Sequence, residues 1–435
     1  MAHLVFPASA PRRRAAALLF GLLLSLPGTT LIGSAPAALA GAAAAAPQVG
    51  PKAYVGLFKE DAVAVLDTSA RQVVTRIAVP TGPHGVVLTP DDRQLYVSSD
   101  GASTVSVIDT ATDQITSTIE VGKAPHGLAM SPDGRRLLAA VFGADQVAVI
   151  DPATNRVVGD IPVANPHNIA ITPDGHTAYV ASQRPDDASL AVIDLDGATQ
   201  VGRVPLDKIP RALSVSPDGS RLWFTEAGSD AVQILDTASN AVVAQIPVGA
   251  SPHHPLFTPD GSSALVVSQG PGELALLDPA TDASVATVAV GKMPHWIGLS
   301  GDAHTAYVTD EGSNDVSIVD LVAGKVVATV PVGAAPRKIA VQRAAATTAA
   351  TAGDASVTIK GFAFAPRAVT ISHGQAVVFN NDDAVAHTTT SKEGRWDSGE
   401  LSPGGSYRLV LDQPGTYTFF CAIHPHMTGT VTVER

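Results

Sequence analysis

A repeat of roughly 42 residues, which begins near residue 53, constrains this chain more than any other feature. Each repeat carries an aspartate that ends a short apolar segment and a proline that precedes another. The aspartates are Asp67, Asp109, Asp151, Asp194, Asp236, Asp278 and Asp320. The prolines are Pro83, Pro125, Pro166, Pro210, Pro252, Pro294 and Pro336. Seven copies of both markers indicate seven equivalent structural units.

Each unit contains four short strand candidates separated by Gly, Asp and Pro turn residues. One set is Leu95–Ser98, Val105–Ile108, Ile115–Val121 and Gly127–Met130. Four-stranded units at this period predict a β-propeller, here with seven blades. A lone unit cannot bury both of its faces, so the ring must close. We expect the last strand, Lys338–Gln342, to complete the first blade, which begins at Ala53–Phe58.

The repeats resemble the YVTN-type propeller repeats of surface-layer and periplasmic proteins. The matching residues are Tyr96-Val97, Tyr179-Val180 and Tyr307-Val308-Thr309. The resemblance covers the repeat region, which we assign to residues 52–342 as the propeller. It implies a fold and leaves the function open, since one fold serves many functions.

The repeat ends before an Ala/Thr-rich stretch at 343–355, which is typical of an interdomain linker. In residues 356–435 alternating apolar segments predict a small β-sandwich, so the whole chain is expected to be all-β. The predicted strands are Ser356–Ile359, Ala376–Asn380, Tyr407–Leu411 and Thr416–Phe420.

Residues 1–40 have the pattern of a signal peptide. Arg12, Arg13 and Arg14 precede the apolar stretch Ala15–Leu26, and Ala38-Leu39-Ala40 is a small-residue cleavage site. The adjacent arginines suggest twin-arginine export. We therefore expect a periplasmic or extracellular protein, and no later segment has the length of apolar sequence that a transmembrane helix needs.

The charge and the cysteine count exclude several classes of function. The formal net charge is −12, which gives no support to a nucleic-acid partner. The single cysteine, Cys421, excludes an internal disulfide, a covalently attached c-type haem and an iron–sulfur cluster. Hydrolase and phosphate-binding motifs are also absent from the sequence.

That cysteine lies in the segment Cys421-Ala-Ile-His424-Pro-His426-Met427, between two predicted strands. His387 follows an upstream strand and an Asn/Asp-rich turn. A blue-copper site uses one thiolate, two imidazoles and a weak axial thioether. The segment and His387 supply these donor types.

The last eighty residues resemble the cupredoxins, and the Cys-x-x-His-x-x-Met spacing is similar to that of amicyanin. The resemblance implies one type 1 copper ion held by His387, Cys421, His424 and Met427. His426 is the alternative to His424, but it would leave Met427 as its immediate neighbour. Thr388 stands where many cupredoxins have Asn, which leaves the reduction potential open.

A second cluster of candidate ligands comes from the residue after each marker proline. These residues are His84, His126, His167, Arg211, His253, His295 and Arg337. They open the innermost strands, so we expect them at one mouth of the propeller channel. One interpretation is a second metal or anionic-cofactor site. The other is a structural residue copied by duplication. The marker aspartates are interpreted as turn formers.

The domain order resembles that of nitrous oxide reductase, whose dinuclear copper centre needs two cysteines that this chain lacks. The sequence favours an exported electron-transfer protein with a periplasmic redox partner. Its propeller would dock that partner or hold a second metal or cofactor. The alternatives are a copper-dependent oxidoreductase with a histidine-ring metal centre, and a non-redox copper-binding or scaffold protein.

Overall fold

The computed structural model describes residues 51–343, 354–372, 375–411 and 413–434. The predicted signal peptide and most of the predicted linker lie outside these ranges. The described residues form nine four-stranded sheets, together with one short 3-10 turn, Phe142–Ala144. This confirms the all-β fold class. No helix in the described part of the chain is long and apolar enough to cross a membrane.

Seven of the sheets are the propeller blades, each an antiparallel meander of four strands, named here from the innermost strand outward. The first four blades are β28 (Pro336–Val341), β1 (Lys52–Leu57), β2 (Ala62–Asp67), β3 (Gln72–Ala78); β4 (Pro83–Leu88), β5 (Gln94–Ser99), β6 (Thr104–Asp109), β7 (Gln114–Glu120); β8 (Pro125–Met130), β9 (Leu137–Val141), β10 (Gln146–Asp151), β11 (Arg156–Pro162); and β12 (Pro166–Ile171), β13 (Thr177–Ser182), β14 (Ser189–Asp194), β15 (Thr199–Pro205). The last three are β16 (Pro210–Val215), β17 (Arg221–Glu226), β18 (Ala231–Asp236), β19 (Ala241–Pro247); β20 (Pro252–Phe257), β21 (Ala264–Ser268), β22 (Glu273–Asp278), β23 (Ala283–Ala289); and β24 (Pro294–Leu299), β25 (Thr305–Asp310), β26 (Asp315–Asp320), β27 (Lys325–Pro331).

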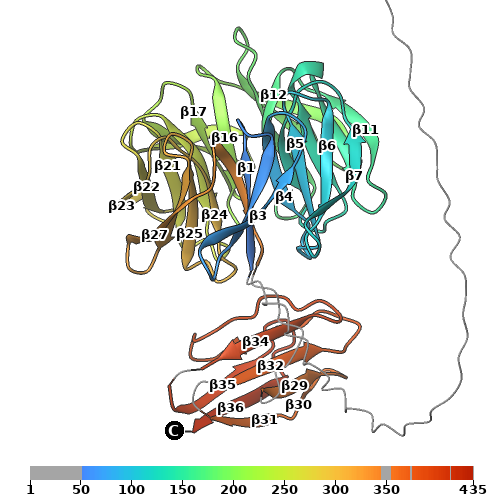
Figure 1. The fold of residues 1–435 in the computed structure, drawn as a ribbon, viewed down its shortest axis with the longest axis vertical. Coiled ribbons are helices and arrows are strands. Elements are labelled where there is room, and N and C mark those ends of the chain that lie inside the picture. The colour runs from blue at the N-terminus through green and yellow to red at the C-terminus, as the bar shows by residue number, and fades with distance from the viewer. Residues whose placement is uncertain (1–50, 344–353, 373–374, 412, 435) are drawn as a thin grey trace, which may run out of the picture. The chain divides into compact units, whose positions relative to one another are not determined.

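The ring of blades closes with a strand from each end of the repeat region. β28 pairs antiparallel with β1, with Ala53 opposite Val341 and Tyr54 opposite Ala340. Each innermost strand contacts the innermost strand of the next blade, and β28 contacts β4, which closes the ring of blades drawn in Figure 1. The expected completion of the first blade by the last strand is confirmed.

The seven marker aspartates form turns, as predicted. Asp67 Oδ1 accepts hydrogen bonds from the backbone N–H groups of Ser69 at 2.9 Å and Ala70 at 2.8 Å. The equivalent bond to an N–H two or three residues ahead is made by Asp109, Asp151, Asp194, Asp236, Asp278 and Asp320. These carboxylates are therefore occupied by the backbone.

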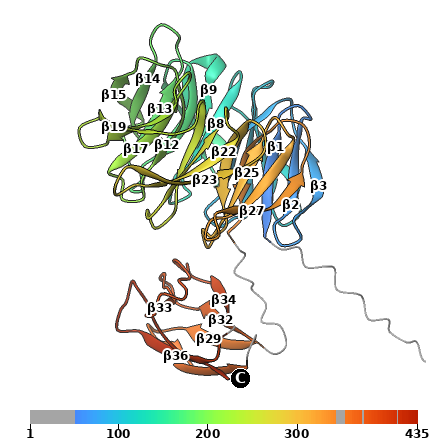
Figure 2. The ribbon, with the colours of Figure 1, turned by 90° about the vertical axis from the view of Figure 1, so that its left-hand side faces the viewer.

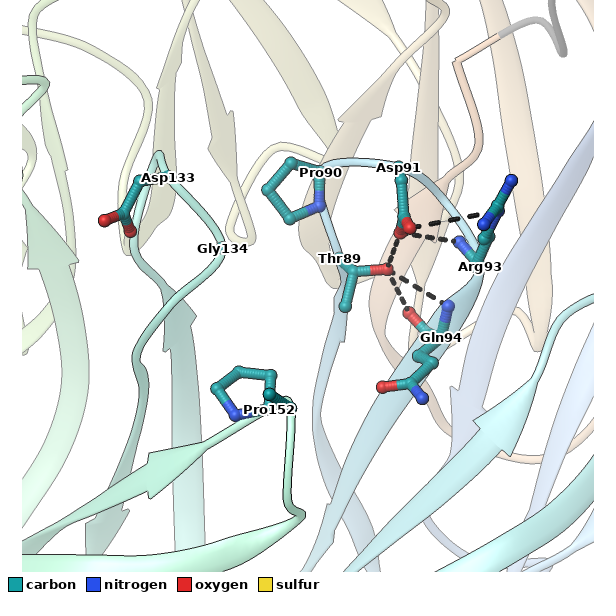
Figure 3. Close-up of a pocket in the computed structure, with 9 residues that line it drawn as sticks. Thr89, Pro90, Asp91, Arg93, Gln94, Asp133, Gly134 and Pro152 are labelled. Atoms are coloured by element: carbon teal, nitrogen blue, oxygen red, sulfur yellow. Dashed lines mark hydrogen bonds and ion pairs between the residues drawn. The ribbon is translucent and has the colours of Figure 1, made fainter. Parts of the chain in front are cut away.

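Turns with the sequence Pro-Asp-Gly, at 132–134, 173–175, 217–219 and 259–261, lie at the other end of the innermost strands from the marker prolines. Figure 3 shows a hollow between the turn at Pro90-Asp91 and the turn at Asp133-Gly134 of the neighbouring blade. Its polar groups bond one another, since Asp91 Oδ1 accepts from Thr89 Oγ1 at 2.6 Å and from Arg93 N at 3.2 Å. The hollow is thus part of the turn structure, and it lies away from the histidines that follow the marker prolines.

The C-terminal strands form a sandwich of two sheets, as predicted (Figure 2). One sheet has the order β30 (Phe364–Ala365), β29 (Ala355–Ile359), β32 (Ala376–Asn381), β34 (Ser406–Val410). The other has the order β31 (Ala368–Ser372), β36 (Thr428–Glu434), β35 (Gly415–Phe420), β33 (Thr390–Ser391). Phe379, Phe419 and Val431 are fully buried between them, in the same cluster as Cys421 and Met427.

Candidate metal centre

Cys421 directly follows β35, and the loop after it returns the chain to β36. The Cys421 N–H donates to the carbonyl of Met427 at 3.1 Å, and the Met427 N–H donates to the carbonyl of His424 at 2.9 Å. These two bonds fold the loop back over its own start. Cys421 is fully buried and Met427 is 2% exposed, while His424 is half-buried.

A second loop brings His387 to the same place. Its backbone makes two hydrogen bonds with Leu401, of 3.1 and 2.7 Å, and its side chain is fully buried. His387 Nε2 lies 3.0 Å from Asp383 Oδ2, so its Nδ1 is turned toward Cys421. The backbone N–H groups of Phe362 and Gly361 also donate to Asp383 and hold the pKa of that carboxyl below its usual range. An ionised carboxylate on the far nitrogen fixes the ring orientation, as in many metal sites.

The cysteine sulfur and the two imidazoles form a triangle of donor atoms. Cys421 Sγ lies 3.7 Å from Nδ1 of His387 and 3.7 Å from Nδ1 of His424, and the two nitrogens are 3.2 Å apart. A point equidistant from all three atoms is about 2.1 Å from each, which is a metal–ligand bond length. The donor set therefore fits one metal ion, and thiolate with two imidazoles is the trigonal set of a blue-copper site.

Thr388 connects the two loops. Its N–H donates to Cys421 Sγ at 3.2 Å, and its Oγ1 accepts from the N–H of Ala422 at 2.7 Å. The residue that departs from the cupredoxin pattern thus still ties the loops together. The role of Asp383 was not predicted, although an acidic residue four positions before a candidate ligand was a usable signal.

His426, the alternative ligand, is exposed, and its ring centroid lies 6.4 Å from that of His424. It is not in the cluster of donor atoms, which contains His387, Cys421 and His424. Phe362 makes a T-shaped contact with the half-buried ring of His424, with ring centroids 4.9 Å apart. Phe362 and Ile423 are each 46% exposed, so they contribute apolar surface near His424.

The propeller brings three of its seven candidate residues into one cluster. Single ligand atoms of His84, His126 and His167 lie within 4.8 Å of one another. Burial, followed by the charge of neighbouring histidines, holds the pKa of His84 well below its ordinary value, and burial does the same for His167.

The other four residues are placed differently. His253 and His295 form a pair with ring centroids 4.0 Å apart. Arg211 Nη1 bonds the side chains of Ser251 and Gln269, at 3.1 and 3.3 Å. Arg337 bonds Glu311 at 3.4 Å and covers the ring of Phe58.

Lys338 is a residue of the propeller centre that the sequence reasoning missed. It is buried, its Nζ donates to Asn168 Oδ1 at 2.5 Å, and it lies 4.1 Å from the centroid of the Trp296 ring. Burial lowers the pKa of Lys338 to about 7. The sequence signal for Lys338 was the position that follows the His or Arg after each marker proline. This position holds a small residue in three blades and a large or polar one in the others.

The fold and the cysteine–histidine cluster define a β-propeller joined to a copper-type β-sandwich. A model of the cupredoxin-like domain matches residues 336–433, and a model of the cytochrome D1 heme domain matches residues 53–168. Through its C-terminal domain the chain belongs to the cupredoxin family, and this homology supports copper binding and a blue-copper electron-transfer module.

Two relatives show the extent of the match. Amicyanin-alpha of Methylorubrum extorquens is 33% identical over 90 residues, which is 20% of this chain and 76% of the amicyanin. Plastocyanin of Vicia faba is 34% identical over 89 residues, 17% of this chain and 90% of the plastocyanin. A chain of Kuenenia stuttgartiensis hydrazine synthase has a TM-score of 0.56 at 24% identity, and covers 60% of this chain and 89% of that chain. This last likeness shows the fold alone.

The residues of the propeller cluster do not fit a haem, the group named for the cytochrome D1 heme domain that matches residues 53–168. The rings of His84, His126 and His167 contact one another, with centroids 4.7, 5.4 and 5.0 Å apart. His126 also stacks on Phe142 at 4.8 Å. A planar macrocycle would have to separate rings that are in contact.

Proposed function

We propose that the chain is an exported blue-copper electron-transfer protein, with His387, Cys421, His424 and Met427 as the ligands of one type 1 copper ion. The triangle of Cys421 Sγ and two Nδ1 atoms carries this proposal, because it has the composition and the size of a trigonal copper site. Met427, which is buried on the same loop, would supply the weak thioether donor.

The proposed domains are a signal peptide at 1–40, a propeller at 52–342, a linker at 343–355 and a copper domain at 356–435. Copper supplies a one-electron couple at the site. The protein supplies a frame of two hydrogen-bonded loops, which holds the donor atoms in place in both oxidation states. His387 is fully buried, so the half-buried edge of His424 is the route for electrons to the surface.

A periplasmic or extracellular redox partner would dock on the apolar surface formed by Phe362 and Ile423 beside His424. Exposed apolar side chains grouped around a polar edge are typical of interaction sites. The propeller would serve as a partner-docking or second metal-binding module.

Copper loading of the full chain tests the proposal. We expect one equivalent of Cu(II) to give the intense visible absorption and the narrow EPR hyperfine splitting of a thiolate-bound type 1 site. Cys421→Ser should abolish both signals. His426→Ala is the matched control and should retain them, because His426 is outside the donor cluster. A colourless copper-loaded chain would exclude the blue-copper assignment.

An enzymatic function is the second candidate, as a copper-dependent oxidoreductase with a metal centre in the propeller. The cluster of three histidines favours it over a non-redox copper-binding or scaffold role. It requires more than one metal ion per chain, which metal analysis of the purified protein measures.

A further inference from the structure

The histidines of the second, third and fourth blades are brought together by the backbone of the propeller. His84, His126 and His167 each occupy the second position of an innermost strand, β4, β8 and β12. A Cβ on Gly85 would lie 2.5 Å from the carbonyl oxygen of His126, and one on Gly127 would lie 2.5 Å from that of His167. The two glycines therefore allow the strands to approach so closely that the three imidazoles meet.

In two of these histidines one ring nitrogen has no hydrogen-bond partner. Nδ1 of His84 and Nδ1 of His126 are buried and make no hydrogen bond. A buried polar atom without a partner costs free energy, so such atoms in a native protein call for a physical explanation. A bound ion would provide that partner for both.

The other ring nitrogen of His126 is held as it is in many metal sites. His126 Nε2 lies 3.1 Å from Asp100 Oδ1, so a proton on Nε2 leaves the lone pair of Nδ1 free. His167 Nδ1 lies 3.0 Å from the side-chain amide nitrogen of Asn168 and 3.4 Å from the carbonyl oxygen of Arg211, and ligation through Nε2 would require Nδ1 to donate to that carbonyl. A carboxylate or carbonyl behind each ring is the usual second layer of a histidine-ligated ion.

We infer that His84, His126 and His167 form a second metal site, which binds one late first-row transition ion, copper or zinc. Imidazoles suit these ions, and three of them leave a fourth position for water or a small anion. The ligand atoms lie within 4.8 Å of one another, whereas nitrogens on a tetrahedral ion are about 3.4 Å apart. Binding therefore draws the rings together by small side-chain rotations. This second site can be tested independently of the copper centre, because Cys421 lies in the other domain.

The test uses the full-length chain with the first site disabled by Cys421→Ser and His424→Ala. We expect this variant to bind one equivalent of Zn(II) in calorimetry, and one of Cu(II) with nitrogen couplings in EPR and no thiolate absorption band. Adding His126→Gln or His84→Ala should remove that equivalent. Adding Asp100→Asn should weaken the affinity about 10- to 100-fold, since it removes only the group behind the ligand.

The matched control is His253→Ala in the same background. His253 occupies the equivalent position in another blade, and in the described residues it belongs to no cluster of three donors. This control should retain the equivalent of metal, and circular dichroism checks that each variant is folded. Failure of the disabled chain to bind Zn(II) or Cu(II), equal loss in His253→Ala, or a haem absorption band in the purified protein would overturn the site.

Discussion

At the scale of single residues, Thr388 shows how one side chain can set the geometry of a metal centre. Its backbone N–H donates to Cys421 Sγ, and its hydroxyl oxygen accepts from the N–H of Ala422 in the same loop. Because the two ligand loops come from distant parts of the chain, such bonds hold His387 at a constant distance from the sulfur. A substitution can remove the hydroxyl bond and leave the bond of the backbone N–H in place.

Thr388→Val should therefore weaken copper binding while keeping the shape of the side chain. Loss of one hydrogen bond of about 1 kcal/mol corresponds to an affinity about 5-fold lower. Competition with a Cu(I) chelator measures this affinity. Thr388→Ser, which keeps the hydroxyl, should stay close to the wild-type value. Equal affinities for the Val and Ser variants would contradict the role of Thr388 Oγ1.

The buried amine of Lys338 is expected to make the stability of the folded protein depend on pH. Its pKa is about 7 in the folded protein and near 10.5 when unfolded, because burial disfavours the charged ammonium. Between these values the unfolded chain binds more protons, so this residue makes stability rise as pH increases from about 7 to about 10.5. The free-energy cost of burying Lys338 is largest below pH 7, where its amine is charged in the folded protein.

Lys338→Met should remove this dependence. The difference in melting temperature, variant minus wild type, should be most positive near pH 6 and should decrease by pH 9.5. Thermal unfolding followed by circular dichroism across this range measures it. Lys325→Met, at an exposed position, is the control and should give a difference that does not change with pH. A constant difference for Lys338→Met would refute the argument.

At the scale of elements, tyrosines on several of the second strands tie one blade to the next. The hydroxyl of Tyr96 on β5 donates to Asn155 Oδ1 in the turn after β10, at 2.7 Å. Tyr54 bonds Asp113 at 3.0 Å and Tyr179 bonds Asn240 at 2.9 Å in the same way. The apolar ring fills the space between sheets while the hydroxyl holds the neighbouring turn.

Tyr96→Phe should lower the free energy of unfolding by about 1 kcal/mol, the usual value of one such bond. Tyr179→Phe should have a similar effect, and the double variant should show the sum, because the two bonds join different pairs of blades. Urea unfolding followed by fluorescence gives these values. Wild-type stability in both single variants would show that the hydroxyls contribute nothing.

At the scale of the whole propeller, the closing strand pairs residues from the two ends of the domain, such as Ala53 and Val341. Ile339 on β28 is 4% exposed and belongs to one apolar cluster with Val55 of the first blade and Val316 of the last. Every blade buries its faces against its neighbours, so loss of apolar packing around Ile339 is expected to destabilise the ring as a unit.

Ile339→Ala should destabilise the propeller by about 2–5 kcal/mol, and the propeller should still unfold in a single transition. Differential scanning calorimetry distinguishes this from the separate loss of one blade. Val158→Ala, at a position 64% exposed on β11, should change stability by no more than about 0.5 kcal/mol. A separate early transition in Ile339→Ala would indicate that the blades unfold independently.

The sequence by itself determined the architecture, because a regular repeat leaves few ways to bury both faces of each sheet. The Asp and Pro markers predicted the seven blades, their turns and the strand that closes the ring. In the C-terminal domain the segment from Cys421 to Met427 predicted the copper-type centre, since its donors are close together in the chain.

Only the tertiary structure decided which distant groups meet. It placed Asp383 behind His387, Thr388 between the loops, and Lys338 in the propeller centre. It also separated His84, His126 and His167 from the other residues of the ring. Spacing along a repeat places side chains at equivalent backbone positions, but their contacts depend on the size and charge of neighbours in adjacent blades, which no single repeat contains.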